Sequence, residues 1–304
     1  MSAIRNGLTY MGGLFVLMIF FWVSFLIFAV YSIMQVSGSE MNLANLQIKT
    51  DHAVGVVEAT GEIMNSDKFI KNLKDNIDNE KIKAIVIKID SPGGAVGASE
   101  EMYRAVKEAS AKKPVVCSMG NIAASGGLMT AAGCKKIVAN ESTLTGSIGV
   151  IMMSPNLSTI MEKVGFSMNV VKSGKLKDAG SPFKAVSEDD KAYLQGLVNK
   201  SYEQFVRIIS ESRNIPIEKV KSFADGRIIL GGEAKELGLI DEIGGLNQAA
   251  KLALKLANDD SEPEIILPSK KQGIMSMLGD VRESKVFFLL KSLSNPQLLS
   301  YAEY

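Results

Sequence analysis

The sequence predicts an α/β fold in which parallel strands alternate with helices, preceded by one apolar N-terminal segment. Between residues 53 and 257, short runs of β-branched residues alternate with stretches of helical periodicity. Glycine-rich junctions connect several of these strands to the helices that follow them. The chain has 304 residues, 46% of them hydrophobic, which is enough for one sizeable domain with accessory segments.

The N-terminal segment carries no charge between Arg5 and Glu40. As a helix, Leu14–Met34 would be roughly 31 Å long, about the hydrocarbon thickness of a bilayer. A cleaved signal peptide, whose apolar core is usually shorter, and a buried core helix are the alternatives. We expect a transmembrane anchor within residues 1–38. Because Arg5 precedes it, the N-terminus should lie inside and the chain after Ser39 outside the cytoplasm.

Three strands and the helices between them are expected in the first half of the globular region. Valine- and isoleucine-rich runs predict the strands at 53–61, 83–90 and 113–120. Apolar spacing predicts helices over 66–80 and 96–110. A further helix should begin in the small-residue segment around Ser125.

The second half is expected to contain strands at 135–140, 146–153 and 168–171. A long amphipathic helix follows over 187–214, with Ser187 as its cap. A strand, a helix, a turn and a last helix occupy 226–257. These elements place the globular domain at 39–258, and a linker with a helical tail at 259–304. The tail helix could pack on a neighbouring subunit, touch the membrane surface, or do neither.

Composition excludes several classes of function. The net charge is +1 and there is no long basic run, so nucleic acid is not an expected partner. The two cysteines, Cys117 and Cys134, are too few for a disulfide-stapled scaffold, and we expect them to be buried and free. Without a CxxC motif or a His/Cys cluster, no metal or other cofactor is expected.

Two glycine-rich junctions carry the candidate chemistry. Gly93 and Gly94 follow a strand and open a helix, so their amides could hold an oxyanion or a phosphate, or form an ordinary tight turn. Ser125 lies between a strand and a helix, with Gly126 behind it. An exposed serine at such an elbow suits a nucleophile. A helix N-cap is an equally good explanation from this segment alone.

A nucleophilic Ser125 would need a base to take its proton. The single histidine, His52, falls at the start of the first strand and is expected to be a surface or strand-edge residue. A lysine whose pKa is lowered by burial could serve instead. The glycine-rich loop KSGKLKDAGSPF offers Lys172, Lys175 and Lys177, and each could equally be a solvated surface lysine.

Five motifs in order resemble the signal peptide peptidase A family: IDSPGGAVGASEEMYRAV, SMGNIAASGG, LTGSIGVI, KSGKLKDAGSPF and GRIILGGEAKELGLIDEIGG. The resemblance covers residues 54–257. It implies a Clp protease/crotonase-like βαβ superhelix and a membrane-anchored serine protease with a Ser-Lys dyad. One departure is Leu128, where the family often has an aromatic residue, so the local packing or pocket shape could differ.

The resemblance also implies roles for individual residues. Ser125 matches the nucleophile and Lys177 the general base. Ser147 matches the hydroxyl that orients this lysine. Gly94 and Gly126 match the positions whose backbone amides form the oxyanion hole.

These residues lead us to expect a single-pass membrane endopeptidase whose catalytic domain is extracytoplasmic. Its substrates would be cleaved signal peptides and other unfolded chains, bound as an added strand. The resemblance implies a ring-shaped homo-oligomer, in which Ser125 and Lys177 could come from neighbouring protomers. Two alternatives keep the fold: a crotonase-like acyl-CoA enzyme that holds a thioester enolate on the same amides, and a catalytically silent membrane scaffold.

Overall fold

The computed structural model divides into two units, residues 1–47 and residues 48–304. The residues it describes are Met18, 20–25, Phe28, Ile48, 50–268 and 299–301. Most of the expected anchor therefore lies outside the described residues. Within the described part of the chain, no helix is both long and apolar enough to cross a membrane. The transmembrane helix stays a prediction.

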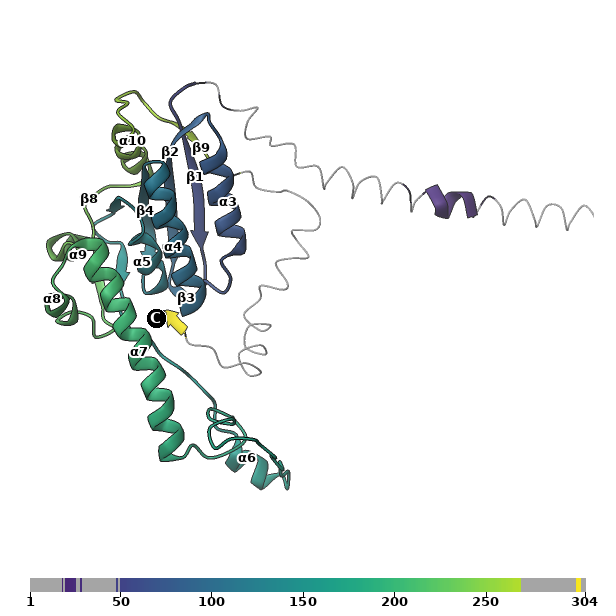
Figure 1. Ribbon diagram of the computed structural model, residues 1–304. Coiled ribbons are helices and arrows are strands. Elements are labelled where there is room, and N and C mark those ends of the chain that lie inside the picture. Colours follow the sequence, from purple (N-terminus) through teal and green to yellow (C-terminus); the bar gives the residue numbers. More distant parts are fainter. Residues whose placement is uncertain are drawn as a thin grey trace, which may run out of the picture. The chain divides into compact units, whose positions relative to one another are not determined.

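A mostly parallel sheet forms the centre of the second unit (Figure 1). Its consecutive inner strands are β1, β2 and β4, and each pairs in parallel with the next. The valine- and isoleucine-rich β2 is buried on both faces, which explains why the sequence shows a continuous apolar run there. The parallel strands are β1 (Ala53–Thr60), β2 (Ile82–Ser91), β4 (Val115–Ala123), β5 (Lys136–Ala139), β8 (Glu242–Ile243) and β9 (Glu264–Ile266).

Helices cover both faces of this sheet. On one face lie α3 (Asp67–Asp78), α4 (Val96–Lys112) and α5 (Gly126–Ala131), which share the larger apolar core. On the other lies α10 (Leu246–Leu256), whose buried alanines pack against Val54 and Val86. The βαβ alternation expected from the sequence is therefore present.

A short antiparallel pair extends the sheet beyond β4. There, β6 (Leu144–Gly146) pairs with β4 in parallel and with β7 (Ile228–Leu230) in antiparallel orientation. The strand expected over 146–153 is wrong, because β6 ends at Gly146 and the next residue, Ser147, has a φ of 48° that interrupts the extended backbone. Two small helices complete this region, α8 (Ile217–Lys221) and α9 (Gly231–Leu237).

Residues 151–187, together with the first half of the next long helix, form what we call the arm. It contains α6 (Ser158–Lys163) and leads into α7 (Glu188–Arg213), and Figure 1 shows both extending away from the sheet. Ser187 caps α7 as expected: its hydroxyl accepts from the Asp190 amide, and the Asp190 carboxylate accepts from the Ser187 amide. The strand expected at 168–171 is wrong, because these residues are exposed and no described strand pairs with them.

Cys117 and Cys134 form a disulfide, contrary to the expectation that both are free. Cys117 lies on β4 and Cys134 follows α5, and their Cα atoms are 5.9 Å apart. The α5 segment turns back along the strand that precedes it, which brings together two residues 17 positions apart. The bond therefore joins the two elements that flank Ser125.

Two segments after residue 258 join the sheet structure. Glu264–Ile266, within the expected linker, is β9 and pairs in parallel with β1. Leu299–Tyr301 is β10 and pairs in antiparallel orientation with the short strand β3 (Gly93–Ala95). The helix expected within the tail lies outside the described residues.

Candidate active site

Ser125 occupies a strained elbow between β4 and α5. Its backbone has φ 52° and ψ −117°, a region that residues other than glycine rarely adopt. Although it precedes the helix, its side chain makes no capping hydrogen bond. The N-cap explanation therefore loses its support, and the geometry is that of a serine presented on a sharp strand-to-helix turn.

The surroundings of Ser125 are tighter than the sequence indicates. Ser125 is fully buried within the protomer, contrary to the expected exposure, because it packs between β6 and the start of α5. A Cβ atom at Gly126 would lie 2.2 Å from the Ser99 hydroxyl, and one at Gly127 would lie 2.9 Å from the Ser91 carbonyl oxygen. The small residues here thus let α5 approach β2, β3 and α4 closely.

Ser147 lies next to the Ser125 segment through backbone contacts. The Ser125 amide donates to the Gly146 carbonyl over 2.9 Å, and the Thr145 hydroxyl donates to the Ala123 carbonyl over 2.7 Å. Ser147 itself is nearly buried and has a positive φ of 48°. The two serines predicted to belong to the site are therefore held on neighbouring backbone segments.

Gly94 sits at the centre of β3, with different partners on its two edges. The Ile63 amide donates to the Gly93 carbonyl over 2.8 Å, and the Ala95 amide donates to the Ile63 carbonyl over 2.7 Å. Because backbone groups alternate along a strand, the N–H and C=O of Gly94 face the opposite edge, where Ser300 is the register partner. A Cβ atom at Gly94 would lie 2.1 Å from the Ile63 carbonyl oxygen, so the position requires glycine.

The two predicted oxyanion amides belong to segments in contact. A Cβ atom at Gly126 would lie 3.3 Å from the Gly93 Cα atom. The Gly126 amide also belongs to the first turn of α5, where helical N–H groups lack an intrahelical acceptor. The two amides predicted to form the oxyanion hole therefore lie on adjoining backbone segments, one of them directly after Ser125.

Lys177 lies apart from this cluster, in the arm. Its side chain is exposed, and none of the hydrogen bonds or ion pairs found among the described residues joins it to Ser125 or Ser147. His52 lies at the edge of β1, as expected, where its Nδ1 atom is 2.6 Å from an Asp259 carboxylate oxygen. The structure therefore brings together four of the five predicted site residues and leaves the predicted base outside.

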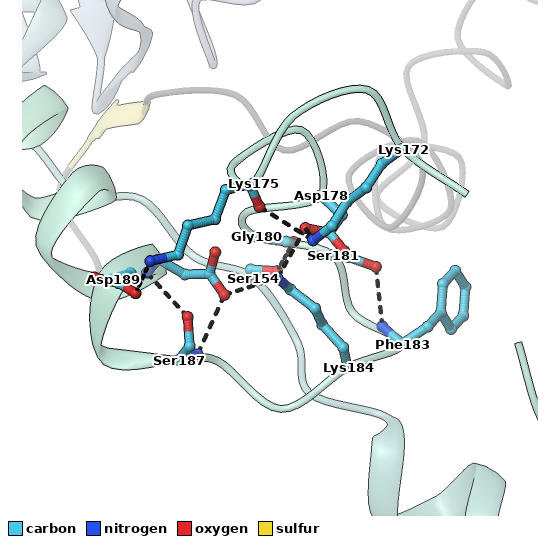
Figure 2. Close-up of polar contacts among 11 residues, drawn as sticks. Ser154, Lys172, Lys175, Asp178, Gly180, Ser181, Phe183, Lys184, Ser187 and Asp189 are labelled. Atoms are coloured by element: carbon cyan, nitrogen blue, oxygen red, sulfur yellow. Dashed lines mark hydrogen bonds and ion pairs between the residues drawn. The ribbon is translucent and has the colours of Figure 1, made fainter. Parts of the chain in front are cut away.

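The other lysines near Lys177 are held by carboxylates (Figure 2). Lys172 and Lys184 both donate to Asp178, and Lys175 pairs with Asp189. Of the lysines at 172, 175, 177 and 184, Lys177 is the one whose ammonium group has no ion pair or hydrogen bond to the described residues.

Electrostatics in this loop follow from the ion pairs. Hydrogen bonds from Lys172, then from Lys184, lower the pKa of the Asp178 carboxyl. Hydrogen bonds to Asp190 and Asp178 raise the pKa of Lys184, and the same contact with Lys184 lowers the pKa of Asp190 to about 2. Sequence reasoning missed this cluster. Its available signals were the carboxylate directly after Lys177 and the acidic residue at the third position of α7.

Comparison with known proteins agrees with the fold. Residues 52–145 match the family model described as Clp protease, so the protein has a Clp protease-like α/β fold with a mixed sheet. The match to a peptidase family and the protease names of the relatives support a protease of this fold.

Residues 107–259 match the model of peptidase family S49. A putative protease of Synechocystis sp. is 44% identical over 215 residues, covering 70% of this chain and 77% of the relative. A putative signal peptide peptidase SppA of Enterococcus faecium is 38% identical, covering 67% of this chain and 62% of the relative. The chloroplastic serine protease SPPA of Arabidopsis thaliana is 33% identical, covering 73% of this chain and 34% of the relative. This chain belongs to peptidase family S49, the family of signal peptide peptidase SppA.

Proposed function

We propose that this protein is a membrane-anchored serine endopeptidase with a Ser-Lys dyad, which degrades cleaved signal peptides and other unfolded chains. The observation that carries the proposal is the strained backbone of Ser125 at the sharp junction between β4 and α5. A positive φ at a serine is tolerated only where the surrounding structure fixes it, and such positions cluster at active sites.

The chemistry would proceed in two steps. Ser125 Oγ attacks the peptide carbonyl while neutral Lys177 accepts the hydroxyl proton, and the amides of Gly94 and Gly126 hold the oxyanion. Lys177 then gives the proton to the leaving amine, and an ester on Ser125 remains. Water, activated by the same lysine, hydrolyses the ester and releases the acyl half of the substrate. Ser147 orients the amine.

Lys177 is favoured as the base by what surrounds the other candidates. Lys172 and Lys175 are each ion-paired with a carboxylate, Asp178 for Lys172 and Asp189 for Lys175. The Lys177 ammonium group has no such ion pair within the described residues.

A neighbouring protomer is the proposed source of that lysine. Lys177 lies on the arm, without contact to Ser125 of its own chain. The arm also exposes many apolar side chains, an arrangement that marks surfaces buried on association. They include Ile151, Met153, Ile160, Val164, Phe166, Met168, Val170 and Val171. A ring-shaped homo-oligomer would bury them and complete each site.

Substrate would bind as a strand added to β3. The edge of β3 that carries the Gly94 amide accepts an extended segment of this chain, Leu299–Tyr301. An unfolded apolar peptide could use the same backbone groups, with its scissile carbonyl over Ser125. The C-terminal strand would then have to leave before substrate enters.

The proposed location is the cell membrane, with a single N-terminal span, the N-terminus inside, and the catalytic domain of residues 39–258 outside the cytoplasm. The uncharged segment between Arg5 and Glu40 supports an anchor in contact with lipid. The Cys117–Cys134 disulfide supports an oxidising compartment.

Two single substitutions test the dyad in the full chain. Ser125→Ala and Lys177→Ala should each lower kcat on an unfolded apolar peptide roughly 10⁴-fold or more. Ser125→Ala should also abolish labelling by a fluorophosphonate probe. The matched control is Lys175→Ala, which removes a lysine from the same loop. Full activity in both single variants would refute the dyad, and a wild type that binds peptide without cleaving it would favour a scaffold.

A further inference from the structure

A chain of four charged side chains surrounds the segment that carries Lys177. Lys172 Nζ lies 2.6 Å from Asp178 Oδ1, and Lys184 Nζ lies 2.9 Å from the same oxygen. Lys184 Nζ also lies 2.8 Å from Asp190 Oδ2. The Asp178 side chain is only 15% exposed and that of Asp190 3%, so the carboxylates are covered while the lysines reach in from solvent. We call these four residues the clamp.

The clamp ties the loop to a fixed point, the start of α7. Asp190 is the third residue of α7 and forms the capping box with Ser187, so its position is set by the helix. Through Lys184, Asp190 holds Asp178, and Asp178 is bonded to Lys177 along the chain. Lys172 Nζ also donates to the Lys175 carbonyl over 3.1 Å, which fixes the residues before Lys177.

Backbone contacts add little to this restraint. The Lys177 amide donates to the Gly174 carbonyl over 3.1 Å, and the Ser181 amide donates to the Asp178 carbonyl over 3.0 Å. Both hydrogen bonds lie within the loop itself. The arm offers no strand or apolar core to this segment, because residues 164–177 are exposed throughout. The clamp and the Lys175–Asp189 ion pair are thus the side-chain contacts that connect this described segment to α7.

The charges of the clamp also cancel. Two lysines face two aspartates, so the clamp has no net charge to attract or repel the Lys177 ammonium. Asp178 is adjacent to Lys177, yet its Oδ1 atom accepts from Lys172 and Lys184. In the clamp, Asp178 therefore pairs with these two lysines rather than with the lysine beside it.

We propose that Asp178 is a positioning residue for Lys177. It accepts both neighbouring ammonium groups, fixes the loop to α7, and leaves the Lys177 amine uncommitted to any carboxylate. This inference rests on the proposed function, since it assigns a role relative to the proposed base. Asp178 touches neither substrate nor Ser125, and it acts only through where it holds Lys177.

The test compares Asp178→Asn with Asp178→Glu in the full-length protein, using an unfolded apolar peptide. Asp178→Asn should lower kcat roughly 10²-fold, the loss expected when a catalytic group is misplaced by about an ångström. KM should change less than about two-fold, because substrate binds on β3 rather than on the loop. Asp178→Glu keeps the charge and should recover kcat to within about ten-fold of the wild type.

Asp75→Asn is the matched control, because Asp75 forms an exposed ion pair with Lys71 on α3. The Asp75→Asn variant should leave kcat and KM unchanged. If Asp178 acts only by positioning Lys177, the Asp75→Asn and Asp178→Asn variants should have the same melting temperature and the same oligomeric state. A purely structural role would instead change stability or assembly. Loss of assembly in Asp178→Asn would count against the inference, and so would a kcat equal to that of the control or a glutamate variant no better than asparagine.

Lys177→Ala separates failure of this inference from failure of the proposed function. If Lys177→Ala keeps its activity, the Ser-Lys dyad is wrong and Asp178 has no base to position. If Lys177→Ala is inactive while Asp178→Asn is fully active, the dyad stands and only the positioning role is wrong.

Discussion

Two inactive variants should restore each other if one site draws Ser125 and Lys177 from neighbouring protomers. The perturbation is a mixed oligomer of Ser125→Ala and Lys177→Ala chains, made by co-expression with two different tags and purified on both. The expectation follows from the arm, where Lys177 has no contact with Ser125 of its own chain. Each variant alone should be inactive.

The magnitude follows from counting intact pairs around a closed ring with one kind of interface. With equal amounts of the two chains placed at random, half of the sites have Ser125. Half of the adjacent arms carry Lys177. About one quarter of the sites should therefore be complete, giving about one quarter of the wild-type kcat per protomer. If the dyad formed within one chain, no site would be complete.

A second mixture gives an independent reading. When wild-type chains share oligomers equally with the Ser125→Ala/Lys177→Ala double variant, about one quarter of sites should be intact for pairing between chains. Pairing within a chain would leave about one half intact. A fluorogenic unfolded peptide measures both mixtures. An inactive first mixture together with half activity in the second would refute pairing between protomers.

Three further predictions concern ionisation, the disulfide and the C-terminal strand. Lys184 holds the pKa of Asp190 at about 2, below its ordinary value of 3.8. The ion pair therefore stabilises the fold fully at pH values above 3.8, and this stabilisation is lost as the pH falls through about 2. Asp190→Asn should thus lower the melting temperature much more at pH 6 than at pH 2, and an equal decrease at both would contradict the ion pair. Reducing the Cys117–Cys134 bond should lower the free energy of unfolding by about 3 kcal/mol, as expected for a loop of this length. Urea titration with and without reductant measures this, and superimposable curves would count against it. Deleting residues 299–304 should lower KM for unfolded peptide at constant kcat, because β10 occupies the edge proposed for substrate; an unchanged KM would argue against that edge.

Much of the core could be predicted because parallel strands buried on both faces leave an unmistakable apolar run. Ile85, Val86, Ile87 and Ile89 of this run are fully buried in β2, and Ser187 caps α7 as its sequence position indicates. Patterns failed where no partner strand was available. Residues 168–171 have strand-forming composition, but exposed in the arm they remain irregular.

The candidate site, too, could be predicted from the sequence only in part. The glycines around Ser125 identified a junction where backbones approach closely, and Gly94 proved to be a position that no side chain could occupy. Residues alone did not choose among Lys172, Lys175 and Lys177. That difference lies in carboxylates brought close by the folded loop and by α7, which the spacing of lysines does not reveal.

The sequence by itself therefore determined the βαβ core, the serine elbow and the family to which the chain belongs, because apolar periodicity and glycine requirements are local properties. Only the tertiary structure decided that Cys117 and Cys134 are bonded, that the C-terminal strand lies along β3, and that Lys177 stands apart from Ser125. Each of these depends on which distant segments meet. That is fixed by the packing of the whole unit rather than by the residues on either side.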